Sequence, residues 1–416
     1  MSASAAGRAA QEAVKENRLP RRSSREPFRD MIRLLTVIGA RPQIIKAAAL
    51  SRAISGEFSG VVEEHILHTG QHYDDNMSRV FFNELGIPAP YRNLNVGSAP
   101  HGLQTAEMIV GIEKALCEGG FDGVIVYGDT NSTLAGAVAA AKMNVPIYHV
   151  EAGLRSFNMS MPEEINRRVC DTLSSILFAP TDSAVENLAR EGCADDVRTV
   201  FAGGRKRAVI KSGDVMYDNA IYYGEKAERE SSVLRDNRLE DRQYVLATVH
   251  RESNTDRPEN LNGIFRAMAD IAGRDGISIV LPLHPRTRKM METALDMELR
   301  RRIGASRMKI IEPVSYLDMV MLEKHARMVM TDSGGVQKEA FFYGKPCVIL
   351  REETEWTEIV SHGAGILTGA DYGRIMDAHK RCMDMDVTFP PLYGDGHAAE
   401  KIVGAITEYS GQEGRR

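Results

Sequence analysis

The sequence contains few cysteines, one tryptophan and no long apolar run. The five cysteines are odd in number and form no C-x-x-C pair, which argues against both a disulfide framework and a cysteine-based zinc site. No stretch approaches the roughly 18 consecutive apolar residues that a membrane span needs, and the N-terminus has no apolar signal-peptide core. We therefore expect a cytoplasmic protein without a bound metal and without membrane insertion.

An excess of basic residues is also absent. Lys and Arg total 52 and Asp and Glu total 57, which gives a net charge of -5 and no reason to expect a nucleic acid as partner. The apolar fraction of 43% and the charged fraction of 26% are typical of globular proteins. At roughly 150 residues per domain, 416 residues predict two or three domains.

Residues 1–30 contain seven Lys or Arg, four Asp or Glu and few large apolar side chains. Such a composition cannot bury enough surface to fold, so we expect a flexible N-terminal extension. A transit peptide is the alternative, but the acidic residues count against it because transit peptides contain few of them.

From Ile32 onward, short β-branched apolar runs alternate with helical patterns, which predicts an α/β fold with parallel sheets covered on both faces. The predicted helices include 131–142 and 260–272. The charged stretches 205–211 and 225–242 are the expected crossing between two doubly wound halves. The predicted strands are 32–38, 64–68, 123–127, 146–150, 243–249, 277–283, 308–311, 328–330 and 347–350.

Polar residues follow the first-half strands, at the strand ends where open parallel sheets bind ligands. The turn at Gly39 leads into a helix with Arg41 and Lys46, which could bind phosphate, although solvated cations give the same pattern. Asp129 follows a strand and could simply cap the next helix. Glu151 ends a buried strand, where a carboxylate needs a partner.

Glu163 has two structural interpretations beside a functional one. It could complete a capping box that Ser160 begins, or pair with Arg167 one helical turn later. In the second half, His250 follows a strand, and a lone histidine is more often structural than catalytic.

The strongest local signal is the segment Thr331-Asp332-Ser333-Gly334-Gly335, which follows a strand. Ser333 is a suitable N-cap, Gly334 and Gly335 allow a ligand to approach, and the helix N-terminus favours a diphosphate. Glu339, in the same helix, could reach ribose hydroxyls. A plain capped helix is the alternative, but each early glycine costs about 1 kcal/mol relative to alanine.

Taken in order, these motifs resemble the non-hydrolysing UDP-N-acetylglucosamine 2-epimerases, over about residues 31–405. The motifs that carry the resemblance are Gly39-Ala40-Arg41-Pro42, Thr69-Gly70-Gln71-His72, Gly128-Asp129-Thr130, His149 to Arg155, Pro162 to Arg167, His250-Arg251, Thr331 to Gly335 and Tyr393-Gly394-Asp395-Gly396.

The resemblance implies the GT-B architecture, in which two Rossmann-like domains hold a UDP-sugar in the cleft between them. The first domain would comprise residues 31–212 plus 391–416, with the C-terminal helix returning to it, and the second, UDP-binding domain residues 213–390. The resemblance also implies a homodimer that needs no cofactor.

By position in the motifs, the resemblance implies that Asp129, Glu151 and Glu163 are catalytic carboxylates and that His250 acts near the diphosphate. The implied substrate-binding residues are Arg41, Lys46, Arg167, His250, Ser333, Gly334, Gly335 and Glu339. In this family, UDP is expelled first, loss of the C2 proton gives a 2-acetamidoglucal, and UDP adds back with C2 inverted.

Departures from the family pattern leave the substrate open. Trp356 stands where many members have a substrate-contacting arginine. A tryptophan here resembles the branch of the family that includes epimerases for UDP-2,3-diacetamido-glucuronate. The simpler interpretation is that Trp356 is a packed loop aromatic. Asp74 and Leu103 replace an expected glutamine and arginine near Gln71, His72 and Gln104, so we expect weak or no allosteric activation by substrate.

Three other functions compete with a non-hydrolysing epimerase. A hydrolysing epimerase would release N-acetylmannosamine and UDP. A glycosyltransferase of the same architecture is disfavoured, because three cleft carboxylates exceed what an inverting transfer needs. A non-catalytic UDP-sugar sensor would tolerate loss of a carboxylate or of His250, and none of these residues is lost.

Overall fold

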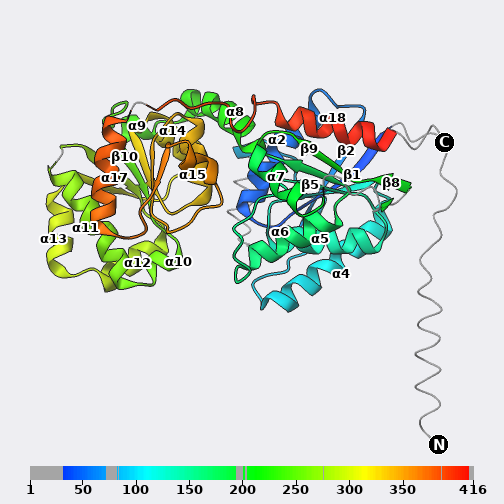
Figure 1. Ribbon diagram of the computed structural model, residues 1–416, viewed down its shortest axis with the longest axis horizontal. Coiled ribbons are helices and arrows are strands. Elements are labelled where there is room, and N and C mark those ends of the chain that lie inside the picture. Colours follow the sequence, from blue (N-terminus) through cyan, green and yellow to red (C-terminus); the bar gives the residue numbers. More distant parts are fainter. Residues whose placement is uncertain are drawn as a thin grey trace, which may run out of the picture.

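The computed structural model describes residues 31–71, 82, 84–193, 200–201, 204–274, 276–385 and 387–411, without the side chains of 200, 205, 274, 285 and 286. The predicted extension 1–30 lies outside the described residues. Two lobes, each built around a parallel sheet, lie side by side along the long axis of the molecule (Figure 1). This arrangement confirms the predicted α/β fold of GT-B type.

The first sheet has the strand order β3-β2-β1-β4-β5-β6-β9, and neighbouring strands are parallel. The order changes direction between β1 and β4, the kind of position at which open parallel sheets bind ligands. The strands are β1 (Ile32–Ile38), β2 (Val62–His68), β3 (Arg92–Asn93), β4 (Gly123–Tyr127), β5 (Ile147–Val150), β6 (Ile176–Ala179) and β9 (Ala208–Lys211).

Helices cover both faces of this sheet (Figure 1). Alternate residues of β1 point to opposite faces, so Leu34 and Ile38 join one apolar cluster and Leu35 and Val37 join another. One face carries α2 (Arg41–Ser55) and α18 (Ala398–Gly411), and the other carries α4 (His101–Gly119), α5 (Asn131–Lys142) and α6 (Pro162–Leu173). α7 (Asp182–Arg190) follows β6, and β7 (Val200–Phe201) and β8 (Arg205–Lys206) form a separate antiparallel pair.

The second sheet has the order β12-β11-β10-β13-β14-β15, also parallel, with its change of direction between β10 and β13. Its strands are β10 (Tyr244–Thr248), β11 (Ser278–Pro282), β12 (Met308–Ile311), β13 (Met328–Thr331), β14 (Cys347–Ile349) and β15 (Gly365–Leu367). The accompanying helices are α9 (Val233–Asp236), α10 (Glu252–Thr255), α11 (Pro258–Arg274), α12 (Pro285–Ala294), α13 (Met297–Ala305), α14 (Tyr316–His325), α15 (Gly334–Phe342), α16 (Thr357–Ser361) and α17 (Tyr372–Asp384).

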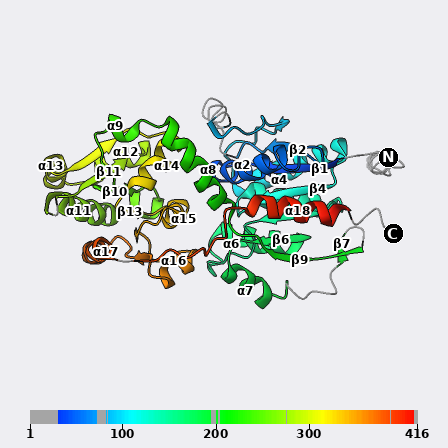
Figure 2. The same ribbon diagram turned by 90° about the horizontal axis from the view of Figure 1, so that it is seen from above.

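The chain passes between the lobes along α8 (Val215–Glu230) and returns in the segment before α18 (Figure 2). The prediction that residues 205–211 belong to the crossing was wrong, because 208–211 form β9 at the edge of the first sheet. The error arose because an edge strand is half exposed and tolerates charge. We propose the domain division at 212/213 and 390/391, because α18 packs against α2 of the first lobe.

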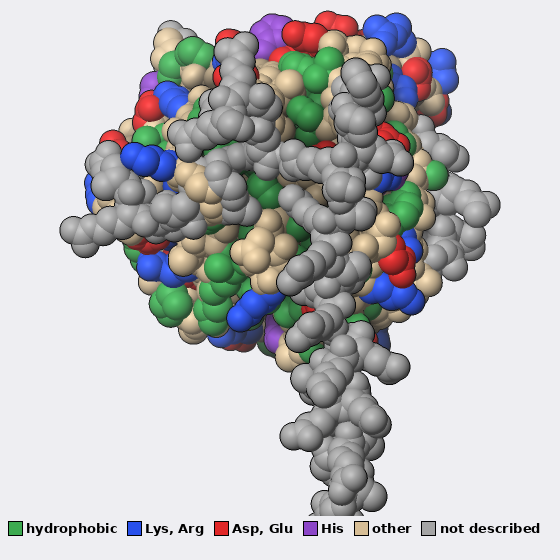
Figure 3. Space-filling model, turned by 90° about the vertical axis from the view of Figure 1, so that its right-hand side faces the viewer, with side chains coloured by type: hydrophobic (Ala, Val, Ile, Leu, Met, Phe, Trp, Pro, Cys, Tyr) green, Lys and Arg blue, Asp and Glu red, His purple; other side chains and the backbone are tan. Residues whose placement is uncertain are grey.

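Within the described residues, no helix is both long enough and apolar enough to span a membrane. The face shown in Figure 3 displays basic and acidic side chains interspersed with apolar ones, in keeping with the nearly balanced charge of the chain.

Candidate active site

The predicted site residues lie at the points where the two strand orders change direction. In the first lobe, Arg41 follows β1 and Asp129 follows β4, the two strands that flank this point. In the second lobe, His250 follows β10 and Ser333 follows β13, which flank the corresponding point. Carboxyl ends of parallel strands meet at one edge of a sheet, so each lobe presents its polar groups at the crevice where such sheets bind ligands.

Asp129 forms the centre of the first-lobe group. Arg167 of α6 donates to its carboxylate over 2.5 Å (Nη2 to Oδ2). Burial raises the pKa of Asp129, the Arg167 and Lys46 cations oppose this, and the nearby carboxylates of Glu151 and Glu163 add to it. The capping interpretation of Asp129 was wrong, because Thr130 is the N-cap of α5 and accepts from the Thr133 amide.

Glu151 is a buried carboxylate held by two lysines. Lys46 Nζ of α2 lies 2.7 Å from its Oε1, and Lys338 Nζ of α15 lies 3.3 Å from its Oε2. Burial by itself would raise the pKa of Glu151, but the two ammonium groups outweigh it and lower the pKa to about 2. The backbone of Glu151 has a φ of 69°, a left-handed conformation that costs a non-glycine residue about 1–3 kcal/mol and that clusters at functional sites.

A buried network beneath Asp129 and Glu151 supports both turns. His149 Nε2 lies 2.8 Å from the Gly128 carbonyl oxygen, and its Nδ1 lies 2.7 Å from the Asp171 carboxylate. Asp171 also accepts from the Gly153 amide over 3.2 Å and from Arg155 over 2.7 Å. The turn before Asp129 and the turn after Glu151 are therefore fixed relative to each other.

Glu163 is exposed in the first turn of α6 and makes no hydrogen bond or ion pair with any residue that the structure describes. Both structural interpretations were wrong: the N-cap of α6 is Met161, without a side-chain bond, and Arg167 pairs with Asp129 and with Glu164. The Glu163 charge nevertheless acts on Asp129 of its own lobe and on Arg251 of the other. Its carboxylate therefore lies between the lobes and is available to a ligand.

The helix α15 begins as the sequence predicted. Ser333 is its N-cap, and the Ser333 hydroxyl oxygen accepts from the Val336 amide over 3.5 Å. A side chain at Gly334 would collide with Glu355, because a Cβ there would lie 2.7 Å from a carboxylate oxygen. At Gly335 a Cβ would meet only ordinary contacts, with the side chains of Ser333 and Glu339.

Glu339 and His250 complete the second-lobe group. Burial raises the pKa of Glu339 to about 7, against the opposing charges of Lys338 and of Arg41 across the cleft. The His250 side chain is 44% exposed, and its backbone amide donates to the buried Asp332 carboxylate over 3.1 Å. Partial burial lowers the pKa of His250, whereas the Asp332 carboxylate opposes the shift.

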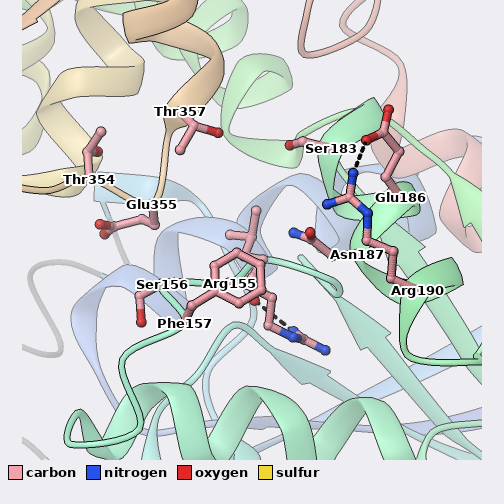
Figure 4. Close-up of a pocket in the computed structure, with 11 residues that line it drawn as sticks. Arg155, Ser156, Phe157, Ser183, Glu186, Asn187, Arg190, Thr354, Glu355 and Thr357 are labelled. Atoms are coloured by element: carbon pink, nitrogen blue, oxygen red, sulfur yellow. Dashed lines mark hydrogen bonds and ion pairs between the residues drawn. The ribbon is translucent and has the colours of Figure 1, made fainter.

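A cavity of about 220 Å³ lies between the lobes and borders this group. It is lined by Leu154, Arg155, Ser156, Phe157, Ser183, Glu186, Asn187, Arg190, Thr354, Glu355 and Thr357, none of them a predicted site residue. Figure 4 shows Thr354 and Glu355 of the second lobe facing Ser156, Phe157 and Asn187 of the first. Glu355 links this cavity to the site, because its carboxylate lies beside Gly334 at the start of α15. Burial opposes the lowering of the Glu355 pKa, but the charges of Arg351, Arg251 and Arg167 outweigh it.

Trp356 is 4% exposed and packs in an apolar cluster with Phe341 and Tyr393, as the packed-aromatic interpretation predicted. The Lys338 ammonium lies 3.9 Å from the centre of its ring. Of the positions discussed for activation, His72 and Asp74 lie outside the described residues, whereas Gln71 and Gln104 bond to Ser132 and Asn131 at the start of α5.

Sequence reasoning missed three supporting residues. Lys338 and Asp214 complete the ion pairs around Glu151, and Asp332 anchors the His250 loop. Asp332 carried a usable signal, because it is an acid directly after a buried strand, as Glu151 is. The partners of Lys338 lie 124 and 187 residues away in the chain, so no local pattern could reveal them.

Comparison with known proteins identifies the family. A family model described as UDP-N-acetylglucosamine 2-epimerase matches residues 57–407. The UDP-2,3-diacetamido-2,3-dideoxy-D-glucuronate 2-epimerase of Pseudomonas aeruginosa is 44% identical over 373 residues, which are 89% of this chain and 98% of that protein. The UDP-N-acetylglucosamine 2-epimerase of Methanocaldococcus jannaschii is 39% identical over 379 residues, which are 90% of this chain and 99% of that protein.

Solved structures agree with this result. The Methanocaldococcus jannaschii UDP-GlcNAc 2-epimerase in complex with UDP-GlcNAc and UDP has a TM-score of 0.78 at 38% identity, and the match covers 91% of this chain and 99% of that one. The Neisseria meningitidis UDP-GlcNAc 2-epimerase bound to UDP-GlcNAc has a TM-score of 0.72 at 27% identity, covering 91% of this chain and 100% of that one. The resemblance inferred from the motifs is confirmed, and the chain belongs to the UDP-N-acetylglucosamine 2-epimerase family.

Proposed function

We propose that this protein is a UDP-sugar 2-epimerase of the non-hydrolysing type, which inverts C2 of UDP-N-acetylglucosamine or a close derivative. One observation carries the proposal: three carboxylates from separate segments converge. Glu163 belongs to the helix whose Arg167 binds Asp129 over 2.5 Å, and the Glu151 carboxylate lies beside Gly128, the residue before Asp129. Both carboxylates also act electrostatically on Asp129. Removing a proton from one face of C2 and returning it to the other requires more than one such group.

The second lobe supplies the groups that expulsion of UDP requires. The N-terminus of α15 at Ser333 and Gly335 presents backbone N–H groups and a positive helix end, which stabilise a diphosphate. His250 lies at the neighbouring strand end, and Arg41 faces the helix from the first lobe. Positive groups around the leaving diphosphate favour cleavage of the C1–O bond, because negative charge develops there in the transition state.

The three carboxylates have different environments, which suits different protonation roles. The raised pKa of Asp129 favours a carboxyl group that can hold a proton, whereas Glu151 stays ionised between two lysines. Glu163 is exposed between the lobes and has no competing partner among the described residues. We propose all three as catalytic residues, without assigning each to a face of C2.

Proton NMR of UDP-N-acetylglucosamine incubated with the protein in D2O tests this function. The expected result is deuterium at C2 together with UDP-N-acetylmannosamine. Free N-acetylmannosamine with UDP would instead identify a hydrolysing enzyme, and binding without exchange would identify a sensor. The same assay with UDP-2,3-diacetamido-glucuronate tests the derivative, because the Pseudomonas aeruginosa relative of that name is 44% identical to this chain.

A further inference from the structure

The Lys338 side chain lies where four chain segments meet. Its ammonium is 2.6 Å from Asp214 Oδ2, 3.3 Å from Glu151 Oε2 and 3.9 Å from the centre of the Trp356 ring. Lys338 belongs to α15 of the second lobe, Glu151 to the first lobe, and Asp214 caps α8, the helix that crosses between them. One cation therefore joins both lobes and the crossing helix.

The charges in this cluster balance. Lys46, Glu151, Lys338 and Asp214 are each at most 9% exposed, and they supply two positive and two negative charges. Buried charges are tolerated when they are paired, and removing one partner leaves an uncompensated charge that costs several kcal/mol. Without Lys338, Lys46 would be the only cation among the described residues that pairs directly with either carboxylate in the cluster.

Lys338 also lies one helical turn after Gly334, on the helix whose N-terminus we propose to bind the diphosphate. Residues four apart lie on the same side of a helix, so Lys338 shares a side of α15 with Gly334 and contacts Glu151 from there. Lys46, the other partner of Glu151, is a predicted substrate-binding cation. If Lys46 turned to the phosphates, Lys338 would be the cation that stays with Glu151.

We propose that Lys338 is a positioning residue of the epimerase reaction, which holds Glu151 in place as a carboxylate and connects it to the helix that binds the diphosphate. This inference rests on the proposed function. Lys338 itself is 2% exposed and covered by Trp356, so it acts through Glu151 and not on the substrate.

The charged groups around this pair determine the pH dependence. Glu151 is faced by Lys46 from α2, Lys338 from α15 and Asp129 from the turn after β4. Lys338 is faced by Glu151 and Asp214 and also acts on Glu339, which is its neighbour in α15. Loss of the Lys338 charge removes one of the two cations that lower the pKa of Glu151. Burial and the Asp129 carboxylate still raise this pKa, and only Lys46 of the pair remains to oppose them. The pKa of Glu151 must therefore rise.

The test compares Lys338→Met, which removes the charge, with Lys338→Arg, which keeps it. Lys345→Met is the matched control, because Lys345 is a buried lysine of the same lobe, 4% exposed, whose facing charges Arg242, Asp241, Arg327 and Lys324 are all outside the site. The readouts are turnover by deuterium exchange, its pH profile, and UDP affinity by calorimetry.

We expect Lys338→Met to lose at least about 10-fold in kcat. The acidic limb of its pH profile for turnover should move to higher pH. Its affinity for UDP should change by less than about 3-fold. Lys338→Arg should recover most of the loss, and Lys345→Met should behave as wild type. Turnover and a pH profile of folded Lys338→Met equal to those of Lys345→Met would overturn the proposal.

Carbon-13 NMR of glutamate-labelled protein, with Glu151 assigned through Glu151→Gln, decides the matter independently of activity. In wild type the Glu151 carboxylate should remain ionised well below pH 4.5, and in Lys338→Met it should titrate at higher pH. A wild-type Glu151 that titrates near 4.5 would overturn the proposal even if Lys338→Met failed to fold. If wild type showed no exchange, the proposed function would fail, whereas this titration would still decide whether Lys338 controls Glu151.

Discussion

Glu151→Gln is the substitution for which the structure gives the sharpest expectation, because it removes one charge and almost no volume. It abolishes the ion pairs with Lys46 at 2.7 Å and with Lys338 at 3.3 Å. A positioned acid or base contributes about 100- to 10,000-fold to a rate, so turnover should fall by that factor.

The stability loss follows from the pKa of Glu151. Lowering this pKa from 4.5 to about 2 corresponds to about 3 kcal/mol of stabilisation of the folded protein, at about 1.4 kcal/mol per pKa unit. In a lobe of this size, each kcal/mol shifts Tm by about 2–4 °C, so Tm should fall by about 6–12 °C at pH 7.5. Because the folded pKa is lowered, this stabilisation is present above pH 4.5 and lost as the pH falls toward 2. The difference in Tm between wild type and variant should therefore shrink below pH 4.5.

Glu163→Gln is the matched control, because it is the same chemical change at an exposed carboxylate that has no partner among the described residues. It should lose turnover as Glu151→Gln does, but keep Tm within about 1 °C of wild type. Scanning calorimetry together with deuterium exchange measures both quantities. Equal Tm values for the two variants would refute the assignment of Glu151 to a stabilising ion-pair network, and normal turnover would refute a catalytic role for either residue.

Three further predictions concern the network, the ribose site and the central carboxylate. Asp171→Asn breaks a fully buried pair with Arg155, which should cost about 3–5 kcal/mol and lower Tm in calorimetry; a change below about 2 °C would contradict this. Burial raises the pKa of Glu339 to about 7, so if Glu339 accepts from the ribose hydroxyls as the sequence predicts, affinity for UDP-N-acetylglucosamine should strengthen from pH 6 to 8 as Glu339 ionises. Titration calorimetry should find no such dependence in Glu339→Gln, and a dependence that persists would remove Glu339 from the site. Asp129→Asn should lose about 100- to 10,000-fold in turnover in the exchange assay with circular dichroism unchanged, because Arg167 keeps its pair with Glu164 at 3.1 Å; turnover near the wild-type rate would remove Asp129 from the mechanism.

The architecture was predictable because its signals are local. Buried parallel strands need continuous apolar runs, and the predicted ranges 123–127 and 308–311 coincide with β4 and β12. The short edge strands β3 and β15 and the charged β9 were missed, since a strand covered on one side needs less apolar sequence. The strand β6 was missed as well, although it is buried between β5 and β9, because its apolar run is only four residues long. The Ser333 cap was also correct, because capping involves neighbours in the sequence.

Local rules failed at the site itself. The capping-box pattern at Ser160 and the i, i+4 spacing of Glu163 and Arg167 both predicted structural roles for Glu163. In the structure Arg167 reaches Asp129 across the strand ends, and Glu163 is left exposed between the lobes. Tertiary contacts overrode the local preference, as expected where function constrains the residues.

The sequence by itself determined most of the buried strands, which polar residues follow them and which family the motifs resemble. Only the tertiary structure decided which of these residues are paired, how Glu151 stays ionised and which cation does this from the opposite lobe. Strand periodicity and capping depend on residues a few positions apart, whereas the charge state of a buried group depends on every group within a few ångströms. Lys338 and Glu151 are 187 residues apart in the chain and 3.3 Å apart in the fold.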